Sequence, residues 1–128
     1  NGVSLRGIFF EDFQLPFNLA AGITKADQGK AVTLDASAAN QVKLAGDGDP
    51  IVGRLIVVEN RQVEGVIVGT VAFKFADALP YESAPSVGDT VVGSATAGKV
   101  KAAAATDHTA NVVVEVDTAN GFCTVLKL

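Results

Sequence analysis

The chain has 128 residues and a formal net charge of −4, which fits one domain large enough to bury a real core. Lys and Arg number 10 against 14 Asp and Glu, without a basic run that could neutralise successive phosphates, so nucleic acid is not expected as a direct partner. A single cysteine excludes an intrachain disulfide framework and a cysteine-based metal cluster. Ala and Val dominate, and Trp and Met are missing, which favours an all-β fold packed from small and β-branched side chains.

Membrane insertion and secretion are not indicated by the sequence. No apolar run approaches the ~20 residues that a membrane span needs. The N-terminus also lacks a basic region followed by a hydrophobic block. We therefore expect a soluble, unsecreted protein with no membrane partner. Asn rather than Met at position 1 suggests that residues precede it.

Residues 1–22 differ in composition from the rest of the chain. They contain four of the seven phenylalanines, which are Phe9, Phe10, Phe13 and Phe17. Pro16 interrupts them, and a proline lacks the N–H that a helix interior requires and disfavours helix at the preceding residue. The segment is therefore expected to be an extended arm or a strand with a bend.

Two interpretations of these aromatic residues stay open. They could cap one end of the domain's own barrel, or they could form a hydrophobic arm that lies on another subunit. The change of composition near residues 20–22 is typical of a joint between an arm and a domain. We predict an N-terminal arm over residues 1–22 and a β-barrel or sandwich domain over residues 23–128.

Gly29–Val58 carries the pattern of three short strands. Apolar residues alternate or cluster in β-branched runs, and each run ends at a small or turn-forming residue. The polar link Asp35–Asn40 and the segment Gly46–Pro50 supply the turns between them. A meander of β-strands follows from this pattern.

Val63–Phe75 resumes the strand pattern after a polar turn. Gly65 and Gly69 interrupt it at an interval of four residues. Glycine inside a strand marks a bulge, a barrel corner or the close approach of another backbone. A curved sheet is therefore predicted here.

Asp77–Ser86 has the composition of a loop. It contains two prolines and the only tyrosine of the chain, Tyr81, directly after Pro80. Tyr81 on a proline-stiffened loop is a candidate contact residue, and the alternative is a tyrosine that packs over the mouth of the barrel.

The rest of the chain is predicted to form two further strand pairs. Val87–Lys101 echoes the pattern that begins at Gly29, with a strand, a small-residue turn and a returning strand. Val112–Val116 and Phe122–Leu128 form the last pair, and Asn120-Gly121 between them is a strong hairpin signal.

Residues that could carry chemistry are few, and none forms a recognised constellation. His108 is the only histidine and is far in sequence from Cys123, which is interpreted as a small buried side chain of the last strand. Asp47 and Asp49 lack the later ligands of a calcium loop, and the glycine-rich segments lack the spacing of a phosphate-binding loop. We predict no enzymatic activity, no catalytic residue, no cofactor and no metal.

Five segments between Ile23 and Lys101 resemble the capsid decoration, or cement, proteins of tailed bacteriophages. They are Gly29–Val32, Asn40–Leu44, Asp49–Leu55, Gly65–Gly69 and Val87–Val92. The resemblance covers about two thirds of the chain and rests on Gly and Val patterns rather than on a catalytic signature.

The resemblance implies a small, commonly trimeric β-rich protein that binds the outside of an icosahedral bacteriophage head. There it would contact the major capsid protein where capsid subunits meet and reinforce the virion against internal DNA pressure, after assembly in the host cytoplasm. We predict that Phe9, Phe10, Phe13, Phe17, Pro80 and Tyr81 contribute to the capsid or subunit interface. The alternative is a β-barrel accessory module for a small ligand or glycan, with Tyr81, Asp47, Asp49 and His108 lining the site.

Overall fold

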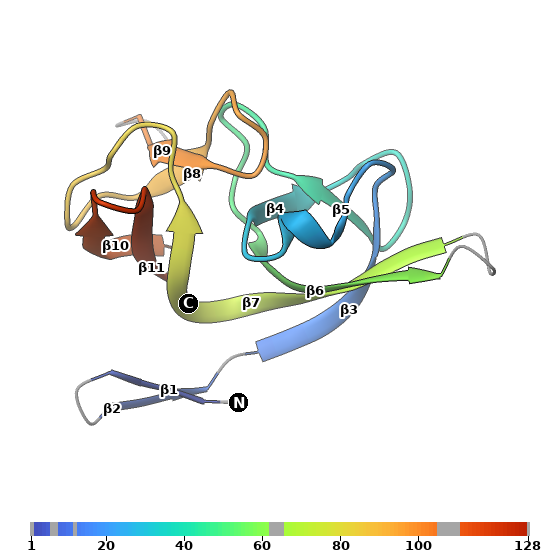
Figure 1. The fold of residues 1–128 in the computed structure, drawn as a ribbon, viewed down its shortest axis with the longest axis horizontal. Coiled ribbons are helices and arrows are strands. Elements are labelled where there is room, and N and C mark those ends of the chain that lie inside the picture. The colour runs from blue at the N-terminus through green and yellow to red at the C-terminus, as the bar shows by residue number, and fades with distance from the viewer. Residues whose placement is uncertain (1, 6–7, 12, 62–65, 105–110, 128) are drawn as a thin grey trace.

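The computed structural model describes residues 2–5, 8–11, 13–61, 66–104 and 111–127 (Figure 1). These residues form β-strands and one turn of 3-10 helix, without an α-helix among them, and the all-β prediction is confirmed. The strands are β1 (Gly2–Leu5), β2 (Ile8–Glu11), β3 (Phe13–Leu19), β4 (Ala31–Leu34), β5 (Gln41–Leu44), β6 (Gly53–Arg61), β7 (Val66–Pro80), β8 (Val91–Gly93), β9 (Val100–Ala102), β10 (Asn111–Asp117) and β11 (Phe122–Lys127), and the 3-10 turn η1 is Lys25–Asp27.

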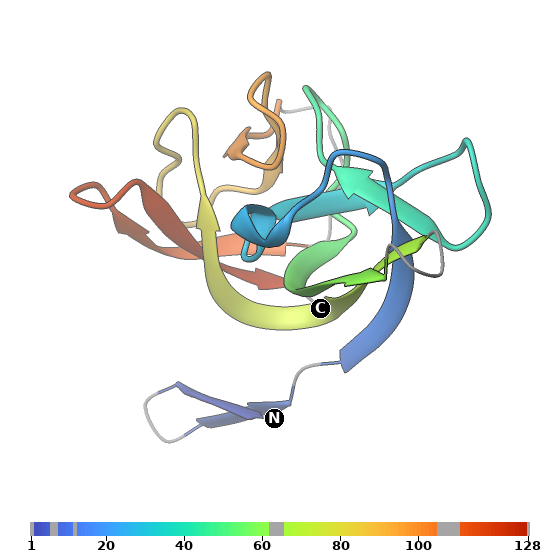
Figure 2. The same cartoon turned by 45° about the vertical axis from the view of Figure 1, so that its right-hand side comes forward.

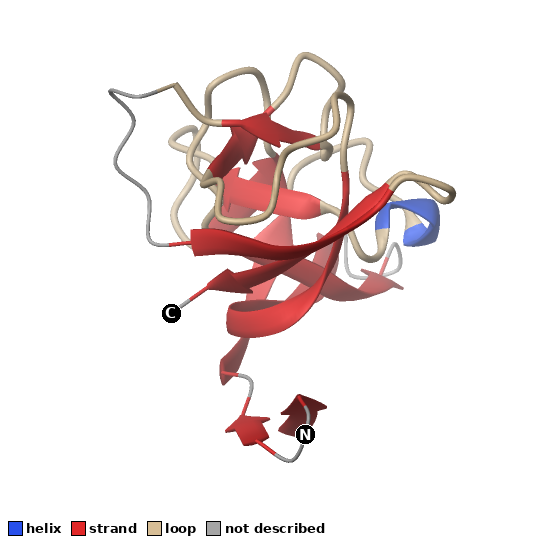
Figure 3. Cartoon of the chain, turned by 90° about the vertical axis from the view of Figure 1, so that its left-hand side faces the viewer, coloured by secondary structure: helices blue, strands red, loops and turns tan. Residues whose placement is uncertain are grey.

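Five of the strands close into a barrel. The order around it is β7, β3, β5, β4 and β6, and β6 pairs again with β7. β3 runs parallel to β5, and the other neighbours in the ring are antiparallel. Two smaller sheets, β1–β2 and β8–β9, lie outside this barrel. In Figure 3 the loops gather at one end of the molecule and the β1–β2 hairpin lies at the other.

β7 is the longest strand, with 15 residues, and it belongs to two sheet regions. Its first part pairs with β3 and β6 in the barrel, whereas residues 75–80 pair with β11, and β10 follows β11 at the edge. The register of β7 with β3 passes from Ala72 to Lys74 across a β-bulge at Phe73. Figure 2 shows the broad arc in which β7 passes from the barrel to β11.

The hydrophobic core consists of two clusters on opposite sides of the barrel wall. The barrel core contains Leu19, Ile23, Val32, Val42, Leu55, Val58 and Val71. The second core contains Ala31, Ala45, Ile51, Ala72, Phe75, Leu79, Val91, Val100, Val113, Cys123 and Val125. Neighbouring residues of one strand, Val71 and Ala72 on β7, belong to different clusters because successive side chains point to opposite faces of a sheet.

The two segments that echo each other in sequence fold as the antiparallel pairs β4–β5 and β8–β9. Backbone hydrogen bonds join the β8–β9 pair to residues at the start of β4 and after β5. Gly98 accepts from the Ala31 N–H at 3.0 Å and donates to the Ala45 carbonyl at 2.9 Å, and the Gly93 N–H donates to the Asp49 carbonyl at 2.8 Å. The β8–β9 pair therefore closes the second core from outside the barrel.

Gly93 lies where two backbones meet, so we predict that Gly93→Ala destabilises the protein by about 1–3 kcal/mol or more. A Cβ at this position would overlap the Gly46 carbonyl oxygen and lie 3.1 Å from the Ala45 Cβ. Gly46→Ala is the control, because its Cβ would meet only a side-chain oxygen, Asp49 Oδ2, at 3.3 Å. Urea unfolding of both variants checks the prediction, and equal losses would contradict it.

The predicted boundary at residue 22 lies after a barrel strand. Residues 13–19 form β3, a barrel strand, and Leu19 is 5% exposed in the barrel core. Pro16 is compatible with this strand because its ring nitrogen faces away from β7. The N–H groups of Asn18 and Ala20 point to β5, and alternation gives the nitrogen of Pro16 the same direction, beyond the end of β5. Only the β1–β2 hairpin of the predicted arm forms a sheet separate from the barrel among the described residues.

The predicted loop over Asp77–Ser86 is corrected, because β7 continues to Pro80. The Tyr81 N–H donates to the Gly121 carbonyl at 3.1 Å, so alternation directs the nitrogen of Pro80 away from β11. Pro80 consequently costs the sheet no hydrogen bond with that strand. Composition therefore predicts a loop from Asp77, although the strand continues to Pro80.

The remaining strand predictions are confirmed with small shifts. Three strands lie in Gly29–Val58, and β10 and β11 form the last pair. Their connection is a four-residue turn, residues 118–121, in which Gly121 has a positive φ of 76°. It is therefore longer than the two-residue turn that Asn-Gly usually indicates. Residues 63–65 of the strand predicted over Val63–Phe75 lie outside the described part of the chain.

Asp35 organises the turn between β4 and β5. Its carboxylate accepts hydrogen bonds from the Ser37 hydroxyl at 2.7 Å, the Ser37 N–H at 3.0 Å and the Gln41 amide at 2.8 Å. These donors, the Ser37 hydroxyl first, lower the pKa of Asp35 to about 2. A carboxyl in the unfolded chain titrates near ~3.9. The ionised group therefore stabilises the fold above that pH, and this contribution is lost as the pH falls from about 4 to about 2.

We predict that Asp35→Asn lowers the melting temperature most near pH 7, and that the difference from wild type shrinks between about pH 4 and pH 2. Ser37→Ala, which removes the strongest donor, should change the pH dependence in the same direction. Calorimetric melting temperatures across this range provide the measurement. A difference that stays constant or grows at low pH would contradict the prediction.

Candidate functional site

Phe17 belongs to the domain. It is half-buried on β3, packs against the barrel core, and its ring meets Phe73 edge-to-face with centroids 5.2 Å apart. The first interpretation of the aromatic segment, packing against the chain's own barrel, therefore applies to this residue.

The three other predicted phenylalanines lie nearer the N-terminus. Phe9 and Phe10 are in β2, where they pair with Ser4 and Val3, and Phe13 begins β3 opposite Lys74. The side chains of Phe9, Phe10 and Phe13 lie outside what the structure describes. Their prediction as interface residues stays a prediction.

Pro80 and Tyr81 lie at the far end of β7. Tyr81 is half-buried, packs against the second core and forms a parallel bridge with Val100. The alternative interpretation of Tyr81, packing over the domain, fits this position. Phe17 pairs with Gly69 and Pro80 with Phe122, at the two ends of β7. The structure thus does not bring the six predicted residues together into one surface.

A three-stranded sheet face of β7, β11 and β10 lies on the side away from the second core. Register places nine residues on it in three rows. Ordered from β7 to β10, the rows are Ala76, Leu126 and Val112; Ala78, Thr124 and Glu115; and Pro80, Phe122 and Asp117. The alternate residues Leu79, Cys123 and Val125 point into the second core. We call these nine residues the β7–β11–β10 face.

Most of this face is apolar and exposed to solvent. Phe122 is 42% exposed, and Leu126, Val112, Pro80 and Ala78 are partly exposed, whereas Ala76 is buried at 3%. The two carboxylates lie on β10, at the edge of the sheet. An apolar sheet face with a charged rim is typical of a surface that another chain covers.

The edge of β10 is partly closed by the chain itself. Val113 exchanges backbone hydrogen bonds with Gly88 and Asp89, both at 2.8 Å. The buried Asn111 side chain replaces a strand partner, because it accepts from the Val91 N–H at 2.8 Å and donates to the Val91 carbonyl at 3.1 Å. Beyond Val113 the register with β11 shifts at a bulge. Addition of another strand along β10 is therefore less favourable than contact with the sheet face.

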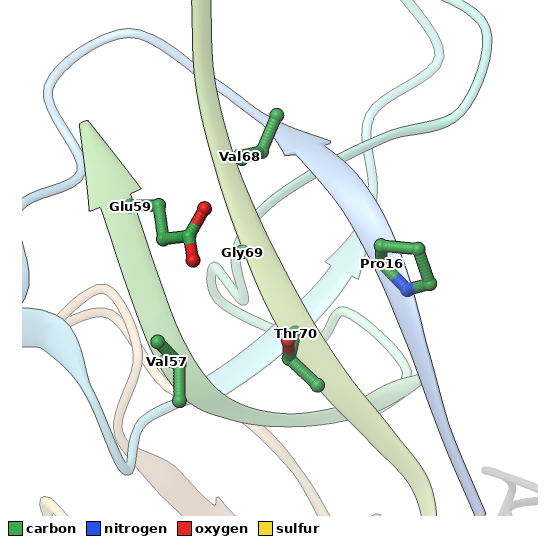
Figure 4. Close-up of a pocket in the computed structure, with 6 residues that line it drawn as sticks. All are labelled: Pro16, Val57, Glu59, Val68, Gly69 and Thr70. Carbon is green, nitrogen blue, oxygen red and sulfur yellow. The ribbon is translucent and has the colours of Figure 1, made fainter. Parts of the chain in front are cut away.

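A second surface feature lies on the outside of the barrel. A shallow depression of about 220 Å³ is lined by Pro16, Val57, Glu59, Val68, Gly69 and Thr70 (Figure 4). Gly69 allows its strands to approach, since a Cβ there would come within 2.7 Å of the Val57 carbonyl and 2.9 Å of the Leu19 side chain. The close approach predicted for this glycine is therefore observed. In Figure 4 the Glu59 carboxylate leans from β6 toward β7.

Charged groups near the bend of β7 have structural partners. Arg54 on β6 donates from Nε to the Ala78 carbonyl at 2.8 Å and lies 3.4 Å from Asp77. Lys127 donates to the Phe73 carbonyl at 2.9 Å, and its burial lowers the pKa of its ammonium group. Both cations stabilise the part of β7 that leaves the barrel.

The residues considered for chemistry are separated in the fold. Cys123 is buried as predicted, and burial raises the pKa of its thiol to about 11, which leaves it protonated near neutral pH. Asp47 forms an ion pair with Lys101, and Asp49 accepts the Gly46 N–H at 2.9 Å. His108 lies outside the described residues. Among the residues that the structure describes, no group of three or more His, Cys, Asp and Glu could hold a metal ion.

Phe122, Leu126 and Val112 are not among the interface residues predicted from the sequence. The final strands nevertheless carry a sequence signal for these residues, because consecutive residues, which point to opposite faces of the sheet, are apolar. A strand with one solvated face alternates between apolar and polar residues, so such a run indicates a second face that needs a cover.

Comparisons with protein-family models, with curated proteins and with solved structures gave no match. In the described part of the chain, no helix has the length and apolarity to cross a membrane.

Proposed function

We propose that the protein is a structural capsid decoration protein, which binds the outer surface of a bacteriophage head between major capsid subunits and stabilises it. The proposal includes a homo-oligomeric, trimeric state on the capsid and a role without catalysis. The observation that supports it is the position in the fold of the five segments that resemble capsid decoration proteins.

All five segments enter a strand of one continuous substructure. Gly29–Val32 enters β4, Asn40–Leu44 covers β5, Asp49–Leu55 enters β6, the described part of Gly65–Gly69 begins β7, and Val87–Val92 enters β8. Four of these strands belong to the barrel, and β8 is joined to the chain between β5 and β6 by backbone hydrogen bonds of Gly93, its last residue. The resembling segments therefore supply neighbouring strands of one barrel, all but β3 of its five, rather than scattered pieces, which supports a shared architecture.

The small size of the surface depressions favours a protein that binds other proteins over a module that binds a small ligand. The depression at Pro16 and Val57 holds about 220 Å³, and the neighbouring one at Phe17 and Asn40 about 280 Å³. Sites for drug-sized ligands usually span roughly 300–1,000 Å³. The apolar β7–β11–β10 face and the separate β1–β2 hairpin instead suit contact with other protein surfaces.

Co-sedimentation with empty heads tests the proposal. The heads are assembled from the major capsid protein that is encoded in the same genome. We expect saturable binding of the wild-type chain and at least tenfold weaker binding of a Phe9→Ser, Phe10→Ser variant with an unchanged melting temperature, because these residues lie in the hairpin and outside the barrel. Leu34→Ser, at a residue 57% exposed on β4, is the control and should bind like wild type.

Failure of the wild-type chain to sediment with heads would overturn the proposed function. Full binding by the hairpin variant would reject the part of the proposal that assigns the contact to Phe9 and Phe10.

A further inference from the structure

Asn120-Gly121, in the turn between β10 and β11, is a dipeptide with a reactivity of its own. An asparagine side chain deamidates most readily when glycine follows it, because glycine has no Cβ to hinder attack by its backbone nitrogen. Asn120 is exposed to solvent, and the turn that holds it spans residues 118–121. Sequence and exposure therefore make Asn120 a candidate for spontaneous modification.

Deamidation proceeds through a ring and consumes one water molecule. The Gly121 nitrogen gives up its proton to solvent base and attacks the side-chain carbonyl carbon of Asn120, and the bond from that carbon to Nδ2 breaks as ammonia leaves. Water then opens the resulting succinimide at either carbonyl, which leaves an aspartate or an isoaspartate. The reaction thus needs a free Gly121 nitrogen and an Asn120 side chain that can turn toward it.

Hydrogen bonds of the turn engage both reacting groups. The Gly121 N–H donates to the Asp117 carbonyl at 3.0 Å, and Asn120 Nδ2 donates to Asp117 Oδ2 at 2.9 Å. Gly121 is also held on its other side, because its carbonyl accepts the Tyr81 N–H at 3.1 Å. The attacking nitrogen must lose the proton that it donates to Asp117, so the reaction has to break this bond.

One carboxylate, that of Asp117, organises the turn. Its Oδ1 accepts the N–H groups of Ala119 at 3.1 Å and Asn120 at 3.2 Å. Hydrogen bonds to this carboxylate, with the Asn120 side chain first, lower the pKa of Asp117, so the group is ionised near neutral pH. Its charge opposes removal of a proton from the nearby Gly121 nitrogen, since that step creates a second negative charge.

We propose that Asn120 is a site of spontaneous deamidation that Asp117 protects, so that modification proceeds only when the β10–β11 turn opens. Surface turns open locally at a lower free energy than the whole fold. The inference does not depend on the capsid assignment.

The products of the reaction disfavour return to the closed turn. An aspartate at position 120 has no amide donor for Asp117 and places a second carboxylate beside it. An isoaspartate lengthens the backbone of the turn by one carbon, which displaces the Gly121 N–H from the Asp117 carbonyl. Modification is therefore an irreversible record that the turn has opened.

Peptide mapping by mass spectrometry tests the proposal. The full chain is incubated in mildly alkaline buffer, either folded or denatured in guanidinium chloride, and is then digested with trypsin. Trypsin releases residues 102–127 as one peptide, because no Lys or Arg lies between Lys101 and Lys127. Fragmentation of this peptide distinguishes Asn120 from Asn111, its other asparagine.

Two variants separate protection by Asp117 from a general loss of stability. Asp117→Ala removes the acceptor of the Asn120 amide, and the control, Asp35→Ala, removes the carboxylate that organises the turn between β4 and β5. Circular dichroism melts establish that each variant is folded. If Asp117→Ala does not fold, Asp117→Ser, which keeps an oxygen acceptor for the turn, takes its place with the same expected result.

We expect Asn120 to deamidate at least about tenfold more slowly in the folded wild type than in the denatured chain, because attack waits for the turn to open. Asp117→Ala should raise the rate in the folded protein at least about fivefold, whereas Asp35→Ala should leave it near the wild-type value. Equal rates in the folded and denatured wild type would overturn the proposal. An Asp117→Ala rate equal to that of wild type, or an equal acceleration by Asp35→Ala, would overturn it as well.

Discussion

The fold depends on the pairing of one strand, β7, with three partners. Its first part completes the barrel between β3 and β6, and residues 75–80 support β11 and through it β10. The bulge at Phe73 lets the strand turn without losing its place in either sheet. Arg54 and Lys127 bond to the carbonyls of Ala78 and Phe73 near this turn. Loss of β7 pairing would therefore open both cores together.

The two-sided barrel wall explains the composition of the chain. Val71 and Ala72 on β7, like Val32 and Ala31 on β4, point to opposite clusters, so neither side of the barrel wall meets solvent at these positions. Small side chains are needed where sheets and turns approach closely, as at Gly93. The abundance of Ala and Val thus follows from close approach of backbones, because larger residues would force the layers apart.

Much of this architecture could be predicted from the sequence, but the outer limits of the domain could not. Short β-branched runs and turn residues located the strands between Gly29 and Val58, since these signals are local. Pro16 in β3 and Pro80 at the end of β7 hide these strands in the sequence, because each proline directs its nitrogen away from a neighbouring strand, and only the pairing shows this. The β7–β11–β10 face depends on which strands become neighbours, so the order of residues along the chain does not predict its rows. The sequence alone also places Phe17 in the arm, because its neighbours in the barrel are distant in the chain.

The central claim is that β7 makes the barrel and the β10–β11 region one cooperative unit. Native-state hydrogen exchange measures this directly through the amides of β7. The account predicts that amides of residues 67–72 and of residues 75–79 exchange with the same free energy of opening, equal to the global free energy of unfolding. Opening of residues 75–79 at a clearly lower free energy than residues 67–72 would contradict it.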